Sequence, residues 1–235
     1  MLTPPTPRRV VVATVTVAMG LALLTGCTVP ELVPVASATP EPLPTVAAPA
    51  EPVIASVAIG GLAFSTLDAD GAVIDTLEYS GEAEAAMDVL NDAFGATPEL
   101  TKQESDHNCV AEAWIADWSD AFYLSYDTVA LPPGQVFAVA AKGPAVNGVT
   151  ISTPGGVAVG ASLADLEASI SGVHSTHYEW EGTVYDFVHY DVGVGTWVEP
   201  DSPEALADEY WGARADVTND AVERLVAPVW YFDAC

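Results

Sequence analysis

A proline-dense stretch near the N-terminus limits how much of this chain can fold. Residues 28–52 repeat Pro, Ala, Val and Thr, as in Thr39-Pro40-Glu41-Pro42-Leu43-Pro44. Proline has no backbone N–H and fixes φ, so this density disrupts helices and sheet ladders and favours extended polyproline II. We therefore expect a tether here. Of the 235 residues, those from 54 onward remain for the folded part, which suits one domain or two small ones.

The residues before the tether have the three-part pattern of a secretory leader. Arg8 and Arg9 are the only charged side chains before Cys27, and an apolar run over residues 10–24 follows them. That run is shorter than the roughly 20 apolar residues of a bilayer-spanning helix. A basic start, a short apolar core and small residues before the cleavage point predict a signal peptide.

The end of this leader, Leu24-Thr25-Gly26-Cys27, resembles the lipobox of bacterial lipoproteins. The resemblance implies that residues 1–26 are removed and that Cys27, as the new N-terminus, carries a diacylglyceryl thioether. Two or more acyl chains, such as palmitate, give stable anchoring. Residues 27–53 then form the lipidated tether, and the membrane is a partner through Cys27 on the extracytoplasmic face of the cell membrane. The alternative is a secreted or membrane-anchored protein with an incidental Cys27.

The cysteine count agrees with an exported protein. The chain has three Cys, and lipidation of Cys27 leaves Cys109 and Cys235. In an oxidising compartment such a remaining pair predicts a disulfide, which would attach the C-terminus to the middle of the folded part. A catalytic thiol is the alternative, but neither residue lies in a recognisable nucleophile motif.

The charge balance excludes one class of partner. The chain carries 33 Asp and Glu against 6 Lys and Arg, a formal net charge of −27. Nucleic-acid binding depends on a basic surface that displaces phosphate counterions, so it is excluded. Adsorption to bare anionic lipid is disfavoured for the same reason. Half of the residues are hydrophobic, which indicates a folded chain.

The order of strand, helix and further strands occurs twice, in units 54–142 and 143–235. Helices are predicted after Ser80, with an end at Gly95, and after Ser162, with Asp165 three residues on. Asp-Gly at residues 70–71 and Asn-Asp at residues 219–220 predict hairpin turns. We therefore expect an α+β fold of two tandem units, with helices packed on one face of antiparallel sheet.

A third hairpin is predicted at Glu181-Gly182. A two-residue turn there sets His174 opposite His189. It also sets His177 opposite Asp186, as an exposed cross-strand pair rather than a catalytic dyad. We expect the other face of this hairpin to be buried, because it carries four aromatic residues: Tyr178, Trp180, Tyr185 and Phe187. No metal site is predicted, since His174 and His177 point to opposite faces of one strand.

A family resemblance covers most of the folded part. The order of its features resembles uncharacterised actinobacterial lipoproteins: the Asp70-Gly71 hairpin, the helix end at Phe94-Gly95, a mid-chain Cys, Gly155-Gly156-Val157-Ala158-Val159-Gly160 before a helix, and a terminal Cys. The tandem plan is also similar, in architecture only, to the β-lactamase-inhibitor-protein fold. A likeness of architecture transfers no residue role.

The sequence contains no Gly-x-Ser-x-Gly, His-Glu-x-x-His, phosphate loop or dinucleotide fingerprint. We therefore expect no cofactor and no catalytic residue, but a non-enzymatic binding or envelope-accessory domain with a protein or cell-wall partner. Trp118, in a polar turn, and Trp197, before Glu199-Pro200-Asp201, are the expected surface anchors. The alternatives are an envelope hydrolase using paired carboxylates and a lipoprotein that captures a ligand or cation.

Overall fold

Strands dominate the part of the chain that the computed structural model describes, which is residues 52–105, 111–129, 131, 132, 134–194 and 211–230. These residues contain 13 strands and two helices. The strands are β1 (Ser56–Ile59), β2 (Ala63–Leu67), β3 (Val73–Glu78), β4 (Glu99–Gln103), β5 (Ala113–Trp118), β6 (Phe122–Tyr126), β7 (Phe137–Ala141), β8 (Ala145–Val146), β9 (Val149–Ser152), β10 (His174–Trp180), β11 (Thr183–Val194), β12 (Trp211–Thr218) and β13 (Ala221–Trp230). The helices are α1 (Ala83–Phe94) and α2 (Leu163–Ser169).

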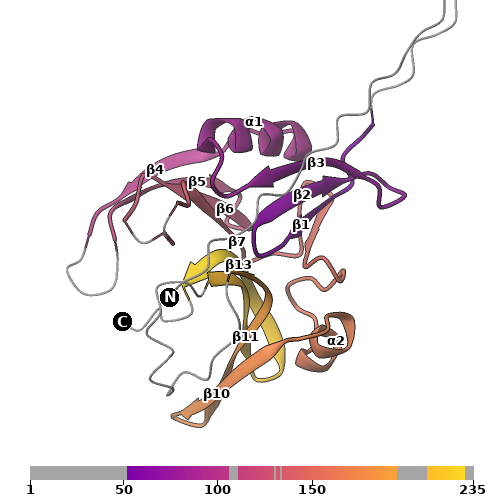
Figure 1. Ribbon diagram of the computed structural model, residues 1–235, viewed down its shortest axis with the longest axis vertical. Helices are drawn as coiled ribbons and strands as arrows, with labels where there is room; N and C mark the ends of the chain where they lie inside the picture. The colour runs from indigo at the N-terminus through magenta and orange to yellow at the C-terminus, as the bar shows by residue number, and fades with distance from the viewer. Residues whose placement is uncertain (1–51, 106–110, 130, 133, 195–210, 231–235) are drawn as a thin grey trace, which may run out of the picture. The chain divides into compact units, whose positions relative to one another are not determined.

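The strands form two sheets (Figure 1). The five-stranded sheet has the order β3-β2-β1-β9-β8, and the eight-stranded sheet has the order β10-β11-β12-β13-β7-β6-β5-β4. Among the described strands, β1 and β9 form the one parallel pair, and every other pairing is antiparallel. Both sheets combine strands from before and after residue 143, because β9 pairs with β1 and β13 pairs with β7.

The expected α+β class is wrong, because the described chain is mostly β, with two sheets as its main layers. Both expected helices exist, but they do not define a helical layer. Helix α2 has seven residues, of which Leu166 alone is buried. The physical reason is that most of the buried side chains lie on strands, while the two helices contribute few of them.

Local turn and capping signals are largely confirmed. The carboxylate of Asp68 accepts the backbone N–H groups of Asp70 and Ala72 at 2.9 and 2.8 Å, closing the β2–β3 hairpin. Ser162 and Asp165 form the expected capping box of α2. The expected cap at Ser80 is wrong, because α1 begins after Glu82, whose side chain makes no cap hydrogen bond.

The other two expected hairpins are also confirmed. The β12–β13 turn places Asn219 and Asp220 at φ 49° and 69°, and Glu181 and Gly182 in the β10–β11 turn both have positive φ. Two successive residues of positive φ form the turn that matches the twist of a hairpin, and Asn, Asp and Gly tolerate that conformation best.

Aromatic side chains join the two sheets. The ring of Phe137 in β7 meets the rings of Phe64 and Tyr79 edge-to-face, at centroid distances of 6.3 and 5.6 Å. A polar contact supports the same junction, because Asp191 Oδ2 accepts the N–H of Gly61 at 2.6 Å. A Cβ at Gly60 would lie 2.7 Å from that carboxylate oxygen, so the close approach requires glycine.

Trp118 is a core residue, and its assignment as a surface anchor is wrong. The expected turn is present, with Ser119 and Asp120 at positive φ, but Trp118 is the last residue of β5 and is 2% exposed. Strand alternation places its side chain on the face that α1 covers. There its ring meets Phe94 edge-to-face at 5.8 Å, and its indole N–H donates to the carbonyl of Ala96 at 3.1 Å.

The β10–β11 register is as expected, with His174 opposite His189 and His177 opposite Asp186. The burial of the two faces is not. On β11, Val188 and Tyr190 are fully buried, while Tyr185 and Phe187 on the other face are only partly buried. The core-facing side is therefore the one that carries Asp186, whose carboxylate is 9% exposed and lies 2.9 Å from His177 Nδ1.

The remaining predicted residues lie outside the described part of the chain: Cys27, Cys109, Trp197 and Cys235. No helix among the described residues is long and apolar enough to cross a membrane.

Candidate functional site

A cavity of about 590 Å³ lies between the start of α1 and the segment that follows β6. Its volume is in the range typical of small-molecule sites. We call it the α1–β6 cleft, and its lining comes from two chain segments: Glu82, Ala83, Glu84, Tyr126, Asp127, Thr128, Val129, Leu131, Gln135 and Val136.

The first wall of the α1–β6 cleft is the start of α1. Glu82 is the N-cap in an extended conformation, and Glu84 lies in the first helical turn. Carboxylates are favoured at this end because the unpaired N–H groups of the helix carry partial positive charge. Ala83, between them, is buried, which fixes this turn of the helix against the core. Both glutamate side chains are exposed.

The second wall begins where β6 ends. Tyr126 is the last residue of β6, and Asp127 follows it with φ 54°. Asp tolerates this left-handed conformation better than most residues, and one such residue redirects the chain. The strand therefore ends with an aromatic ring at the cleft and a carboxylate beside it. Val129 and Val136, 94% and 44% exposed, add apolar surface to the lining.

A row of aromatic residues leads from the core to the α1–β6 cleft. Tyr126 is directly opposite Phe137 on β7 and directly opposite Trp114 on β5. Residues directly opposite one another project from the same face of a sheet. Phe137 is buried, whereas Trp114 is 37% exposed. The face of the sheet beside the cleft thus becomes progressively more open toward Trp114.

The next residue in this row carries a positive charge that is already paired. Lys102 on β4 is opposite Trp114. Its Nζ lies 2.9 Å from Glu112 and 3.5 Å from Glu104, and these carboxylates raise the pKa of Lys102 above its ordinary value, with the Glu112 hydrogen bond as the main cause. The ammonium group therefore stays protonated and bound to its own carboxylates.

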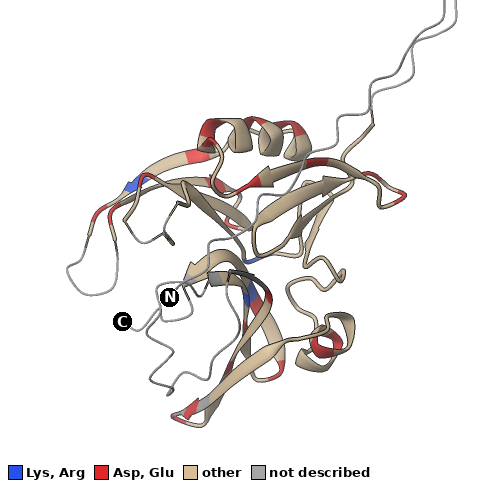
Figure 2. Ribbon diagram, viewed as in Figure 1, with Lys and Arg blue, Asp and Glu red and all other residues tan. Residues whose placement is uncertain are grey.

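The electrostatics of the α1–β6 cleft favour cations. Its described lining contributes three carboxylates, from Glu82, Glu84 and Asp127, and no Lys, Arg or His. Figure 2 shows acidic residues along α1 as well. An aromatic face and carboxylates together attract a positively charged group, while apolar walls accommodate its hydrocarbon body. The described lining therefore combines negative charge with apolar surface.

The residues singled out from sequence do not meet at this cleft. Trp118 lies beneath α1 in the core, and the pair of His177 and Asp186 belongs to the other end of the sheet. Within the described part of the chain, no group of three or more His, Cys, Asp or Glu side chains is arranged to hold a metal ion. Sequence reasoning missed Tyr126 and Asp127, whose only signal was an acidic residue directly after an aromatic strand end.

Comparison of the chain with protein-family models, with curated proteins and with solved structures gives no match.

Proposed function

We propose that this protein is a non-enzymatic binding domain, held on the extracytoplasmic face of the cell membrane by a lipid on Cys27, and that its α1–β6 cleft binds an organic cation. The ligand class is a protonated amine on an apolar body. The proposal rests on one observation. Three carboxylates, an aromatic side chain and aliphatic side chains line the same cavity of about 590 Å³.

Each part of such a ligand has a counterpart in the α1–β6 cleft. The ammonium group would meet the carboxylates of Glu84 and Asp127, which lie on opposite walls. Its hydrocarbon part would displace water from Val129 and Leu131, and the ring of Tyr126 offers a face for cation–π contact. The net charge of −27 raises the local concentration of cations around the protein.

The test is a titration of the full chain with n-butylammonium chloride at constant ionic strength, followed by amide NMR. We expect saturable shifts at residues 82–84 and 126–129. Asp127→Asn keeps the left-handed backbone, because Asn tolerates that conformation, and removes one charge. It should weaken binding by about tenfold, which corresponds to about 1.4 kcal/mol.

Two controls make this titration decisive. Glu167→Gln removes an exposed carboxylate from α2, outside the cleft, and should leave the affinity unchanged. Neutral n-butanol has the same hydrocarbon chain without the charge. If n-butanol produces the same saturable shifts, or if Glu167→Gln and Asp127→Asn weaken binding equally, the α1–β6 cleft is not an organic-cation site.

The anchor has its own test. Cys27→Ala removes the thiol that would carry the lipid, so the variant should leave the membrane fraction, whereas Cys109→Ala should keep the protein there. Mass spectrometry of the N-terminal peptide should find an acylated Cys27. This part of the proposal would be contradicted if the Cys27→Ala variant stays in the membrane fraction and the N-terminal peptide of the wild-type protein carries no lipid.

A further inference from the structure

A second cluster of charged groups lies at the other end of the eight-stranded sheet, on strands β10 to β13. His174 is opposite His189, and His189 is opposite Arg214. Two residues further along β12, Asp216 is opposite Arg224 on β13. Because Arg214 and Asp216 are two positions apart on one strand, both rows project from the same face of the sheet.

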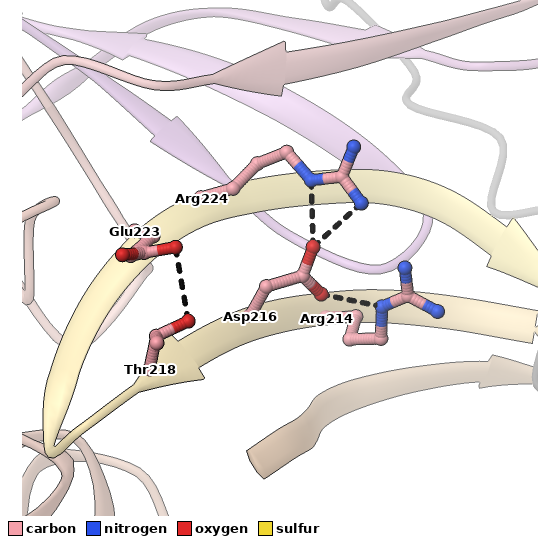
Figure 3. A network of polar contacts seen from close by, with 5 residues as sticks. All are labelled: Arg214, Asp216, Thr218, Glu223 and Arg224. Carbon is pink, nitrogen blue, oxygen red and sulfur yellow. Dashed lines mark hydrogen bonds and ion pairs between the residues drawn. The ribbon is translucent and has the colours of Figure 1, made fainter. Parts of the chain in front are cut away.

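The two arginines of this cluster converge on one carboxylate (Figure 3). Arg214 Nε donates to Asp216 Oδ1 at 2.8 Å, and Arg224 Nε donates to Asp216 Oδ2 at 2.6 Å. Arg224 Nη2 lies 2.5 Å from the same oxygen, Oδ2. Figure 3 shows the remaining amino groups of both guanidiniums turned away from Asp216. Glu223 lies nearer the hairpin turn, where it accepts a hydrogen bond from Thr218 at 2.9 Å.

Among the described residues, the charges of this triad do not cancel. Two guanidiniums and one carboxylate sum to one positive charge, and Arg214 is 7% exposed. His189, also buried, adds no second positive charge, because burial, with a smaller contribution from Arg214, lowers its pKa to about 3. A buried charge that is not balanced is costly. The ring of Phe187, 4.8 Å from Arg214 Cζ, provides some compensation through a cation–π contact.

We infer that Arg214 and Arg224 form a binding site for a small oxyanion, a carboxylate or phosphate group, independent of the α1–β6 cleft. The planar guanidinium presents paired N–H donors that match either group. Asp216 holds Arg214 through Nε and holds Arg224 through Nε and Nη2. Both amino groups of Arg214 and one amino group of Arg224 are left to bind the ligand. Arg224, whose side chain is 38% exposed, is the entry side. The net charge of the triad supplies the attraction in an otherwise acidic protein.

The chain's arginine content makes this inference directly testable. Its four arginines are Arg8, Arg9, Arg214 and Arg224. The first two lie in the leader that is expected to be removed, so the Nε–H region of a ¹⁵N NMR spectrum of the processed protein should contain the signals of Arg214 and Arg224. Sodium phosphate and sodium acetate would each be titrated at constant ionic strength against sodium chloride. We expect saturable shifts of the Nε–H signals of Arg214 and Arg224 with the oxyanion, and no saturable shift with chloride.

Substitutions separate a specific site from general charge attraction. Arg224→Lys keeps the charge but loses the fork, and should weaken oxyanion binding at least tenfold without unfolding the protein, since the side chain is partly exposed. Lys142→Gln removes a basic residue outside the cluster and should have no effect. Saturation by phosphate alone identifies the ligand as a phosphate group, and saturation by both ions includes carboxylates. Shifts no larger than those with chloride, or an affinity unchanged by Arg224→Lys, would overturn the inference.

Discussion

The two ends of the eight-stranded sheet are stabilised by different chemistry. At the β4–β7 end, α1 covers one face of the sheet, and the buried side chains are aromatic and aliphatic: Phe94, Trp118, Phe122 and Leu124. At the β10–β13 end, a face of the same sheet carries Arg214, Asp216 and His189, all largely excluded from water. Apolar burial needs no partner of defined geometry, whereas each buried charge requires one. The second end is therefore the one that a single change of charge should perturb most.

The largest expected effect tests the apolar end. Trp118→Ala should lower the free energy of unfolding by about 4 kcal/mol, because it removes a buried ring and its contacts with Phe94 and Phe122. Urea denaturation measures this. Trp114→Ala, on the same strand but 37% exposed, should cost about 1 kcal/mol or less. Equal losses for the two variants would mean that Trp118 is not the core residue described above.

The next effect tests the charged end. Asp216→Asn leaves two neighbouring guanidiniums without their carboxylate and should cost roughly 3 kcal/mol of unfolding free energy. Asp220→Asn, in the exposed turn of the same hairpin, keeps a residue that tolerates positive φ and should change little. If both variants are as stable as the wild type, the triad contributes no net stability and the contrast between the two ends fails.

The smallest effect is a pH dependence at His189. Its pKa is about 3 in the folded protein and near 6.5 in an unfolded chain, so protons bind the unfolded state first and stability falls as the pH drops through this interval. Between pH 6.5 and pH 5, His189 alone should remove about 1.6 kcal/mol. His189→Gln should flatten the curve over this range in urea denaturation. Identical slopes for wild type and variant would show that His189 is not buried in its neutral form.

Features set by neighbouring residues could be predicted from sequence. The turns at Asp68 and Asn219 and the capping box at Ser162 depend on side chains and φ preferences within a few positions. The β10–β11 register followed from its two-residue turn in the same way. These predictions were confirmed because the features depend only on residues that are close in the sequence.

Features that depend on residues far apart in the sequence could not be predicted from it. Alternation on β11 does not identify the buried face, since Phe187 on one side and Tyr190 on the other are both large and aromatic; only packing against the rest of the fold decides between them. Trp118 was misassigned because its turn is polar, although it lies at the end of a strand that α1 covers. The α1–β6 cleft joins Glu84 and Asp127 only after α1 and β6 have packed.

The parallel pairing of β1 with β9 has a mechanical consequence. β1 is the first strand among the described residues, and it lies in the middle of its sheet with β2 on one side and β9 on the other. The residue just before it is already bound to both neighbours: Ala55 N donates to the carbonyl of Leu67, and its carbonyl accepts from Thr150 N. A pull from the proposed membrane anchor, transmitted through the residues before Ser56, would act along β1. The hydrogen bonds of β1 to β2 and to β9 would then resist the pull together. The pulled strand is therefore hydrogen-bonded to a neighbouring strand along each of its edges.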